Sequence, residues 1–285
     1  MTRLKTEDVK SIPADLTDYD SELIAKTGCT LSGIACRAAK IPEADIQKSL
    51  ETVFIGVIPV TSGEGVISGF CEAVASIISH LGCQTFITQA TDVAGIAEAF
   101  EKKAAIVLLS DDDCFIALHV KSRQIINNAV ATGKGFVVGL NLMAGDLRKR
   151  NVLVIGCGPV GKSATEELAG MGALVSIYDT NFSRSAALSE AMQQSFNAKV
   201  NIVDALDLAL TTHQFMIDAT PAADIISARH ITPHTYISAP GVPLGLDEKA
   251  RLKIGNRLLH DPLQIGVATM VVCACKLHLQ NVSNS

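Results

Sequence analysis

The chain lacks the features that mark several large classes of protein. It has no tryptophan, 4% aromatic residues and 19% charged residues among its 285. Its formal charge of −5, with no basic run longer than "LRKR" at 147–150, argues against a nucleic-acid-binding surface. No apolar run reaches the roughly 18–20 residues of a membrane helix, and residues 1–10 lack a signal-peptide core. We therefore expect a cytoplasmic protein with no nucleic-acid or membrane partner.

Metal and disulfide chemistry is also poorly supported. The chain has eight cysteines but no C-x-x-C pair, and its seven histidines show no pairing at metal-ligand spacing. Cysteines inside apolar stretches such as "VVCACKLHL" behave as small hydrophobic residues. We predict buried, inert thiols and no metal.

The hydrophobic share, 48%, is high enough for two packed domains in a chain of this length. Residues 1–50 have the pattern of helices. From residue 53, short β-branched runs ("VFIGVIPV", "QTFITQ", "AIVLLS") alternate with helical stretches, which predicts a small parallel α/β layer. An apolar, glycine-containing helix is expected over 129–142.

A second α/β unit is predicted from residue 152, with strands at 152–155 and 174–178 and near 200–203, 215–219, 235–238 and 257–259. The predicted class is α/β: a C-terminal Rossmann-type doubly wound parallel sheet, plus an N-terminal α/β domain with a helical N-terminal segment. We divide the chain into a substrate domain, 1–146, and a dinucleotide domain, 147–285. A C-terminal helix at 263–280 is expected to pack back on the first domain.

The stretch "VLVIGCGPVG" at 152–161 carries G-x-G-x-x-G spacing between a strand and a helix. Glycines at these places allow a tight turn, the close approach of a pyrophosphate and helix–strand packing. The cofactor contacts predicted here are Gly156, Gly158, Pro159, Val160 and Gly161. Asp179, 23 residues after Gly156, ends the next strand, where a carboxylate binds a ribose 2′-hydroxyl and repels a 2′-phosphate. NAD is therefore the predicted cofactor.

Later turns belong to the same predicted site. "DATPAAD" and "SAPGVPLG" each follow a strand, at the carboxyl edge where the nicotinamide end rests. This makes Thr220, Pro221 and Pro240 candidate cofactor neighbours.

The first domain carries polar groups at its strand ends. The turn "TSGEG" at 61–65 is expected to open a helix, so that Thr61, Ser62 and the turn amides could hold a carboxylate. "DDD" at 111–113 could bind an ammonium group or take its proton, and equally could be a solvated turn. Asn127 and Asn128 could orient a polar substrate or shape a turn.

These motifs resemble the PylD family, which completes pyrrolysine biosynthesis. The resemblance rests on "IPVTSGEGVISGF" (58–70), "ITQATDVAGIAEAF" (87–100), "LLSDDDCFIALHV" (108–120) and "IINNAVATG" (125–133), and it continues into the dinucleotide fingerprint. Residues 1–50 and the last dozen residues carry little that matches.

The resemblance implies a cytoplasmic, NAD-dependent amine dehydrogenase acting on 3-methyl-D-ornithyl-Nε-L-lysine. The carbon bearing the ornithine side-chain amine would lose hydride, and cyclisation with loss of ammonia would give pyrrolysine. By motif, Ser62 would contact this dipeptide-like substrate, and Asp111 or Asp112 would bind or polarise the reacting amine. We favour Asp112. The oligomeric state is left open, a homodimer included.

Two alternatives remain at this stage. A shikimate- or methylene-tetrahydrofolate-type dehydrogenase has the same order of domains but generally uses a lysine near the first sheet, and the lysines at 102, 103 and 121 fall outside the expected strand ends. A non-catalytic NAD sensor would not need the acidic residues at 111–113.

Overall fold

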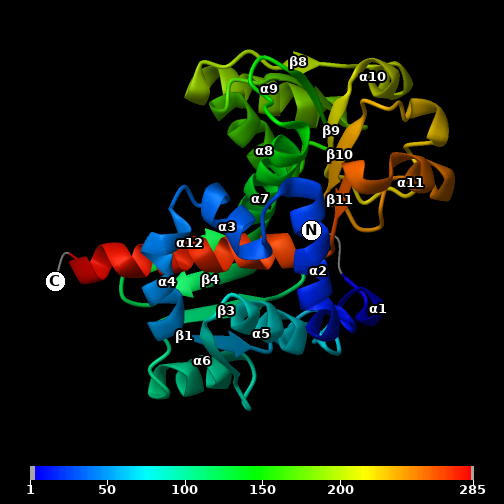
Figure 1. Ribbon diagram of the computed structural model, residues 1–285. Coiled ribbons are helices and arrows are strands. Elements are labelled where there is room, and N and C mark those ends of the chain that lie inside the picture. The colour runs from blue at the N-terminus through cyan, green and yellow to red at the C-terminus, as the bar shows by residue number, and fades with distance from the viewer. Residues whose placement is uncertain (1–3, 284–285) are drawn as a thin grey trace.

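Two β-sheets, each with its own helices, make up the molecule (Figure 1). The computed structural model describes residues 4–283, except the side chains of Lys48 and of 281–283. Among the described residues, no helix has both the length and the apolar character needed to cross a bilayer. The mixed α/β architecture agrees with the predicted class.

The N-terminal segment is helical, as predicted. Its helices are α1 (Thr6–Val9), α2 (Ile12–Thr27), α3 (Leu31–Ala38) and α4 (Glu43–Thr52). Helix α2 ends where Gly28 adopts a left-handed conformation (φ 73°), which glycine reaches without steric cost. Helix α3 begins at Thr30, whose hydroxyl accepts the backbone N–H of Gly33.

The first sheet has the order β2-β1-β3-β4-β5. Its strands are β1 (Phe54–Ile58), β2 (Gln84–Ile87), β3 (Ile106–Ser110), β4 (Phe115–His119) and β5 (Gln124–Asn127), and its helices are α5 (Phe70–His80) and α6 (Asp92–Glu101). Strands β1, β2 and β3 are parallel, as predicted, but β4 and β5 are antiparallel additions. The three predicted strands are thus parallel as expected, and the sheet as a whole is mixed because β4 and β5, which the sequence did not predict, extend it.

A tight turn explains the added strands. Asp111 Oδ1 accepts the backbone N–H groups of Asp113 and Cys114, at 2.9 and 2.8 Å. An aspartate that bonds to its own following backbone stabilises a turn, which here reverses the chain from β3 into β4.

Helix α5 begins later than expected. Its first residue is Phe70, and Gly69 precedes it in a left-handed conformation (φ 82°). The turn at 61–65 is therefore separated from the helix and does not form its N-terminus. The prediction that "TSGEG" opens a helix was wrong, because glycine at 69 breaks the run of helical residues.

The second sheet has the order β11-β10-β9-β6-β7-β8, and every pairing in it is parallel. Its strands are β6 (Asn151–Ile155), β7 (Leu174–Tyr178), β8 (Asn201–Ile202), β9 (Phe215–Asp218), β10 (Tyr236–Ala239) and β11 (Leu258–His260). This order reverses at β6, as in doubly wound dinucleotide-binding sheets. The predicted Rossmann-type sheet is confirmed.

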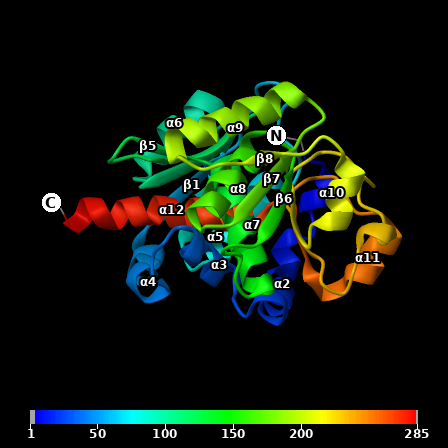
Figure 2. The same cartoon turned by 90° about the horizontal axis from the view of Figure 1, so that it is seen from above.

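Helices cover this sheet on both faces. They are α7 (Asn128–Ala144), α8 (Pro159–Gly170), α9 (Phe182–Phe196), α10 (Leu206–Thr212) and α11 (Glu248–Ile254), with 3₁₀ turns at Ala228–His230 and Gly255–Arg257. Helix α7 runs from the first sheet towards the second and packs on α8 (Figures 1 and 2).

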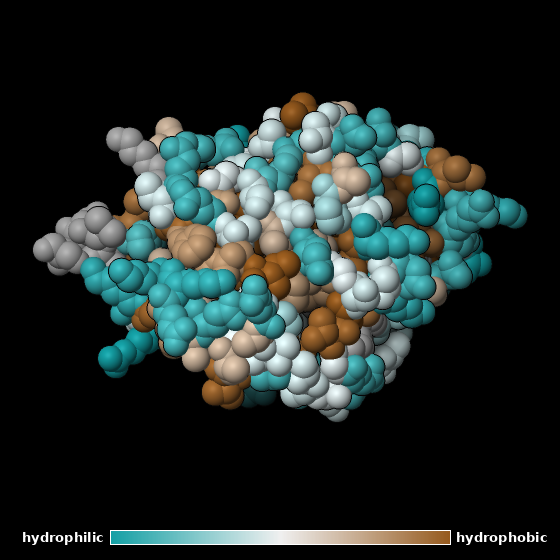
Figure 3. Space-filling model, turned by 90° about the horizontal axis from the view of Figure 1, so that it is seen from below, coloured by the Kyte–Doolittle hydropathy of each residue, from teal (hydrophilic) through white to brown (hydrophobic). Residues whose placement is uncertain are grey.

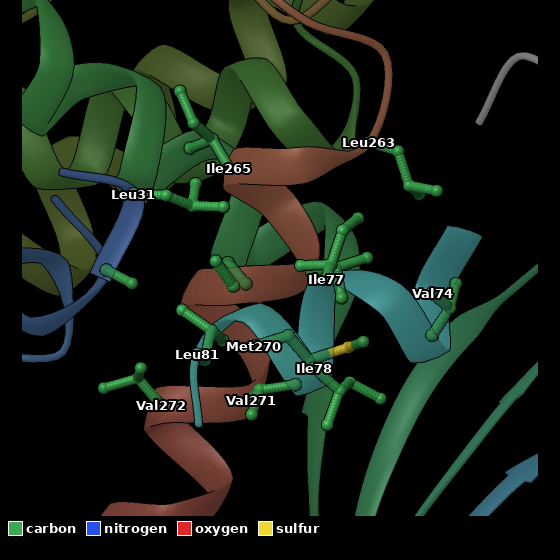
Figure 4. Close-up of a cluster of buried hydrophobic side chains, with 14 of the residues drawn as sticks. Leu31, Val74, Ile77, Ile78, Leu81, Leu263, Ile265, Met270, Val271 and Val272 are labelled. Carbon is green, nitrogen blue, oxygen red and sulfur yellow. The ribbon is translucent and has the colours of Figure 1, made fainter. Parts of the chain in front are cut away.

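The last helix, α12 (Gln264–Ser283), returns to the first half of the molecule. It lies against α3, α4, α5 and α7, and Figure 4 shows Met270 and Val271 of α12 beside Ile77 and Ile78 of α5. These four side chains are fully buried. Much of the largest apolar core is therefore shared between α12 and residues more than 180 positions earlier.

Large exposed apolar side chains come from many elements, among them α2, α6, α9 and α11. The face seen from below shows hydrophobic residues in brown scattered among hydrophilic ones in teal (Figure 3). Scattered exposure of this kind is ordinary on a protein surface.

Candidate functional site

A cavity of about 550 Å³ lies at the carboxyl edge of the second sheet. The turns that follow β6, β7, β9, β10 and β11 line one side, and the first half of α7 lines the other. A crevice at the carboxyl ends of strands, beside the point where strand order reverses, is where open α/β sheets bind ligands. Its volume is in the range of small-molecule and cofactor sites.

The glycine fingerprint forms one wall of this cavity. Gly156, Gly158, Pro159 and Val160 all line it. A Cβ atom on Gly158 would meet nothing within 4 Å, so the cavity is open at the place predicted for a pyrophosphate. Gly156 has φ 94°, in the left-handed region that favours glycine.

Gly161 does not line the cavity. A Cβ atom there would lie 1.8 Å from the carbonyl oxygen of Gly156, so this glycine lets α8 pack against the turn. It supports the site through packing and is not placed to contact a ligand.

Asp179 also lines the cavity, directly after β7. Its Oδ2 accepts the backbone N–H of Cys157 and its Oδ1 accepts that of Asn181, each at 2.8 Å. The carboxylate is thus held beside the fingerprint turn. Thr180 and Arg184, which the sequence did not single out, line the same region.

Thr220, Pro221 and Pro240 line the cavity as well, from the turns after β9 and β10. The Thr220 hydroxyl and backbone N–H donate to Oδ1 of Asp218, at 2.8 and 3.2 Å. Burial raises the pKa of Asp218 to about 6, against the lowering effect of these bonds. These hydrogen bonds to Asp218 therefore hold the turn that contains Thr220 in place.

The acidic residues of the first domain lie in a different, smaller cavity. It measures about 70 Å³, and Asp111 and Asp112 line it with the carboxyl ends of β1 and β3. Leu4 lines both this cavity and the larger one. The two cavities are thus neighbours, and Leu4 lies between them.

The turn at 61–65 is occupied by protein groups. Oδ2 of Asp112 accepts the backbone N–H of Glu64 at 2.8 Å. Thr61 donates both its hydroxyl and its backbone N–H to the carboxylate of Asp92, at 2.6 and 2.8 Å. Ser62 is exposed and lines neither cavity. The structure therefore brings Asp112 to this turn but leaves Thr61 and Ser62 outside the cavities.

The two asparagines play different parts. Asn127 Oδ1 accepts the N–H of Ala129 at 2.8 Å and caps α7. Asn128 lines the large cavity, is 2% exposed, and its Nδ2 has no hydrogen-bond partner among the described residues. A buried amide without a partner is costly, so Asn128 is suited to donate to a ligand oxygen.

Other residues of the site carried no clear sequence signal. Thr132, Asp261 and Gly266 line the large cavity, with Thr132 on α7 and Asp261 just after β11. The sequence made the stretch from Asp261 to Gly266, after the last predicted strand, only a weaker candidate for cofactor contacts, since its proline and glycine could equally mark a loop. The proximity of α7 to this loop depends on the packing of α12, which local pattern does not reveal.

Comparison with known proteins agrees with this architecture. Residues 8–126 match the family model for the N-terminal domain of pyrrolysine biosynthesis protein PylD. Residues 125–234 match the model for the C-terminal domain of alanine dehydrogenase/PNT. Among solved structures, a quinate dehydrogenase from Corynebacterium glutamicum in complex with NAD has TM-score 0.55 at 12% identity, covering 81% of this chain and 99% of its own. A shikimate dehydrogenase from Aquifex aeolicus has TM-score 0.54 at 14% identity, covering 80% and 98%.

These two structures establish a dehydrogenase-type fold. Among curated proteins, the chain is 29% identical to pyrrolysine synthases from Methanosarcina acetivorans and Methanosarcina barkeri, over 95% of its length and 98% and 97% of theirs. The chain therefore carries a PylD-type N-terminal domain and is similar to the pyrrolysine synthases along nearly its whole length, which confirms the resemblance predicted from its motifs.

Proposed function

We propose that this chain is a cytoplasmic NAD-dependent dehydrogenase that completes the formation of pyrrolysine. Its substrate would be 3-methyl-D-ornithyl-Nε-L-lysine, oxidised at the carbon bearing the ornithine side-chain amine. Capture of the oxidised carbon by the ornithine α-amine, with loss of ammonia, closes the pyrroline ring.

The observation that carries this proposal is the large cavity. Its fingerprint turn, the open space at Gly158 and the fixed carboxylate of Asp179 suit the pyrophosphate and ribose of a dinucleotide. NAD, when bound there, supplies the hydride acceptor. Asp179 favours NAD over NADP, because its charge repels a 2′-phosphate.

We assign the substrate to the space between the two halves of the molecule. Asn128, with its unpaired Nδ2, would donate to an oxygen of the dipeptide from the large cavity. Asp111 and Asp112 would face an amino group from the small cavity. Leu4 borders both spaces, so a ligand that reaches from one to the other must displace or pass its side chain.

The roles of Thr61 and Ser62 are less direct. Both lie on the turn whose Glu64 amide bonds to Asp112. We propose that they shape the approach to Asp112, with Ser62 as the exposed hydroxyl available to the substrate. The division into a substrate domain (1–146) and a dinucleotide domain (147–285) is part of the same proposal.

The direct test is turnover. Purified protein is incubated with NAD and D-ornithyl-Nε-L-lysine or its 3-methyl form, and NADH absorbance and released ammonia are measured together. We expect both products in equal amounts, and a dipeptide with norvaline in place of ornithine, which lacks the side-chain amine, should give neither. NADH without ammonia, or no reaction at all, would contradict the proposal.

A shikimate-type dehydrogenase is the second candidate, since the fold is shared. No lysine is present among the described residues that line either cavity, although such enzymes generally use one. Shikimate and quinate are therefore expected to give no NADH in the same assay. A purely NAD-sensing protein would bind NAD and form no product with any of these compounds.

A further inference from the structure

Asp261 is a buried carboxylate in the wall of the large cavity. It follows β11, and its exposed fraction is 3%. The other carboxylate among the described residues that line this cavity is Asp179, after β7. Strands β7 and β11 lie on opposite sides of β6 in the sheet. Asp261 therefore lies towards the end of the cavity away from the ribose-binding position.

The hydrogen bonds of Asp261 leave one acceptor position free. Its Oδ1 accepts the backbone N–H groups of Leu263 and Ile265, at 3.0 and 3.3 Å. Its Oδ2 accepts the hydroxyl of Tyr19 on α2, at 2.6 Å. A carboxylate has about four acceptor positions, so Oδ2 can take one more donor.

No lysine or arginine among the described residues pairs with this buried carboxyl group, although the adjacent His260 lowers its pKa against the raising effect of burial. Among the described residues, Asp261 forms no ion pair. The neighbouring His260 directs Nδ1 to the carbonyl of Ala239, and the Lys26 ammonium on α2 bonds to Glu22 and to the carbonyl of Leu258. A buried carboxylate without an opposite charge is destabilising, so a cationic ligand in the cavity would supply the partner that lysine and arginine side chains do not.

Helix capping alone does not account for an acid here. Helices α3, α7 and α9 are capped by the neutral side chains of Thr30, Asn127 and Asn181, and the aspartate that caps α11, Asp247, is only partly buried. The first turn of α12 could be capped in the same way without burying a charge. We therefore attribute the presence of a carboxylate at this position to a ligand that enters the large cavity.

We propose that Asp261 binds the reacting ammonium group of the substrate and takes one proton from it. This rests on the proposed function. One N–H bond breaks and one O–H bond forms on Oδ2, and the electron pair of the N–H bond stays on nitrogen. The amine becomes neutral as the carboxylate becomes a carboxylic acid, so the total charge is unchanged. The nitrogen lone pair is then available to form the C=N bond as hydride leaves the carbon. Asp112, in the other cavity, faces another amino group of the substrate.

Tyr19 tunes this carboxylate. Burial raises the pKa of Asp261, and the hydrogen bond from Tyr19 opposes that rise. Burial and the charge of Asp261 raise the pKa of the Tyr19 hydroxyl, so it stays protonated as the donor. The other charged or titratable groups near the pair are Asp20, Glu22 and Lys26 on α2, and His260.

The first test is binding without turnover. Asp261→Asn keeps an oxygen for the α12 amides and removes the charge. Binding of D-ornithyl-Nε-L-lysine and of D-norvalyl-Nε-L-lysine is measured by calorimetry with NADH present. We expect the variant to bind the ornithyl compound about tenfold or more weakly, and the norvalyl compound as well as the wild type does. Equal loss for both compounds, or loss for neither, would overturn the proposal.

The second test is the pH profile of kcat/KM for the ornithyl compound. The wild type should lose activity as pH falls through the pKa of Asp261. In Tyr19→Phe this limb should move to higher pH, because the bond that lowers the pKa is gone. Asp261→Asn should lose the limb and about 100-fold or more of kcat. A limb that stays at the same pH in Tyr19→Phe means that Asp261 has only a structural role.

The matched control is Asp247→Asn. Asp247 caps α11 by accepting the N–H of Ala250 at 2.7 Å, and it lines neither cavity. This variant should keep the wild-type affinity and pH profile. If the wild type itself does not oxidise the ornithyl compound, the proposed function fails. If the wild type oxidises the ornithyl compound and Asp261→Asn oxidises it equally well, only the Asp261 proposal fails. If Asp261→Asn loses only its affinity for NAD, the Asp261 proposal is also overturned, because the carboxylate would then bind the positively charged cofactor and not the ammonium group of the substrate.

Discussion

The carboxylate of Asp179 accepts the backbone N–H of Cys157, the residue between the first two fingerprint glycines, at 2.8 Å. The end of β7 and the fingerprint turn are thus held in a fixed relation. Asp179→Ser should narrow the preference for NAD over NADP by about tenfold or more, because it removes the charge that repels a 2′-phosphate. Fluorescence titration with both dinucleotides measures this. Equal or tighter NADP binding by the wild type would remove the assignment.

Gly158 and Gly161 should respond differently to substitution. Gly158→Val adds a side chain in open space, so it should abolish NAD binding with little change in melting temperature. Gly161→Ala forces a Cβ atom against the Gly156 carbonyl oxygen and should lower the free energy of unfolding by about 1–3 kcal/mol. Melting curves and NAD titrations of the pair separate the two effects. Normal NAD affinity in Gly158→Val would mean that the fingerprint is only a structural turn.

Asp112→Asn should lower kcat/KM by about 100-fold, because it loses the charge that binds an amino group of the substrate, with NAD affinity nearly unchanged. The carboxylate lines the small cavity and acts on the substrate, while the dinucleotide residues line the large one. An asparagine oxygen can still accept the N–H of Glu64, so the turn should persist. Asp113→Asn, in the same hairpin turn, is the control and should keep wild-type kinetics. Lost NAD affinity in Asp112→Asn would show that the two cavities are not separate in function.

The pair formed by the buried His119 and the half-buried His278 should make the protein sensitive to acid. Nε2 of His119 lies 3.2 Å from Nδ1 of His278, and burial lowers the pKa of both rings. Rings with a pKa below the unfolded value of about 6.5 are neutral in the fold and take up protons on unfolding, so stability is lost as pH falls below that value. Urea unfolding at pH 7.5 and 5.5 should show this fall, and His278→Gln should reduce it. An unchanged fall in the variant would exclude the pair as its source.

Local pattern predicted the second sheet well and the first sheet only in part. Strands β6 (NVLVI) and β7 (LVSIY) are mostly apolar and are followed by glycine or an acid, which is the pattern of buried parallel strands. The antiparallel strands β4 and β5 were not predicted, because the turn from β3 into β4 consists of acids that also suit a functional edge. Only the bonds from Asp111 to the following amides distinguish the two.

The position of the fingerprint turn in the large cavity was predictable because a short local sequence fixes it, whereas the residues that line the cavity from other elements depend on tertiary packing. Gly156 and Gly158 line the large cavity as expected, and Gly161 has a packing role. Asp261 lies more than 240 residues from Tyr19 along the chain, so nothing in the neighbouring sequence indicates their bond.

Helix α12 has a consequence for the order in which the protein folds during synthesis. Ser49 Oγ donates to the carbonyl of Cys275, 226 residues later. The largest apolar core includes Met270, Val271 and Val272 of the same helix. Until α12 leaves the ribosome, the nascent first domain exposes the apolar surface that this helix later covers. We infer that the second sheet, whose strands are contiguous in the chain, is completed first, and that the N-terminal half closes only after α12 has been translated. Until then, chaperones can protect the exposed apolar surface of the N-terminal half.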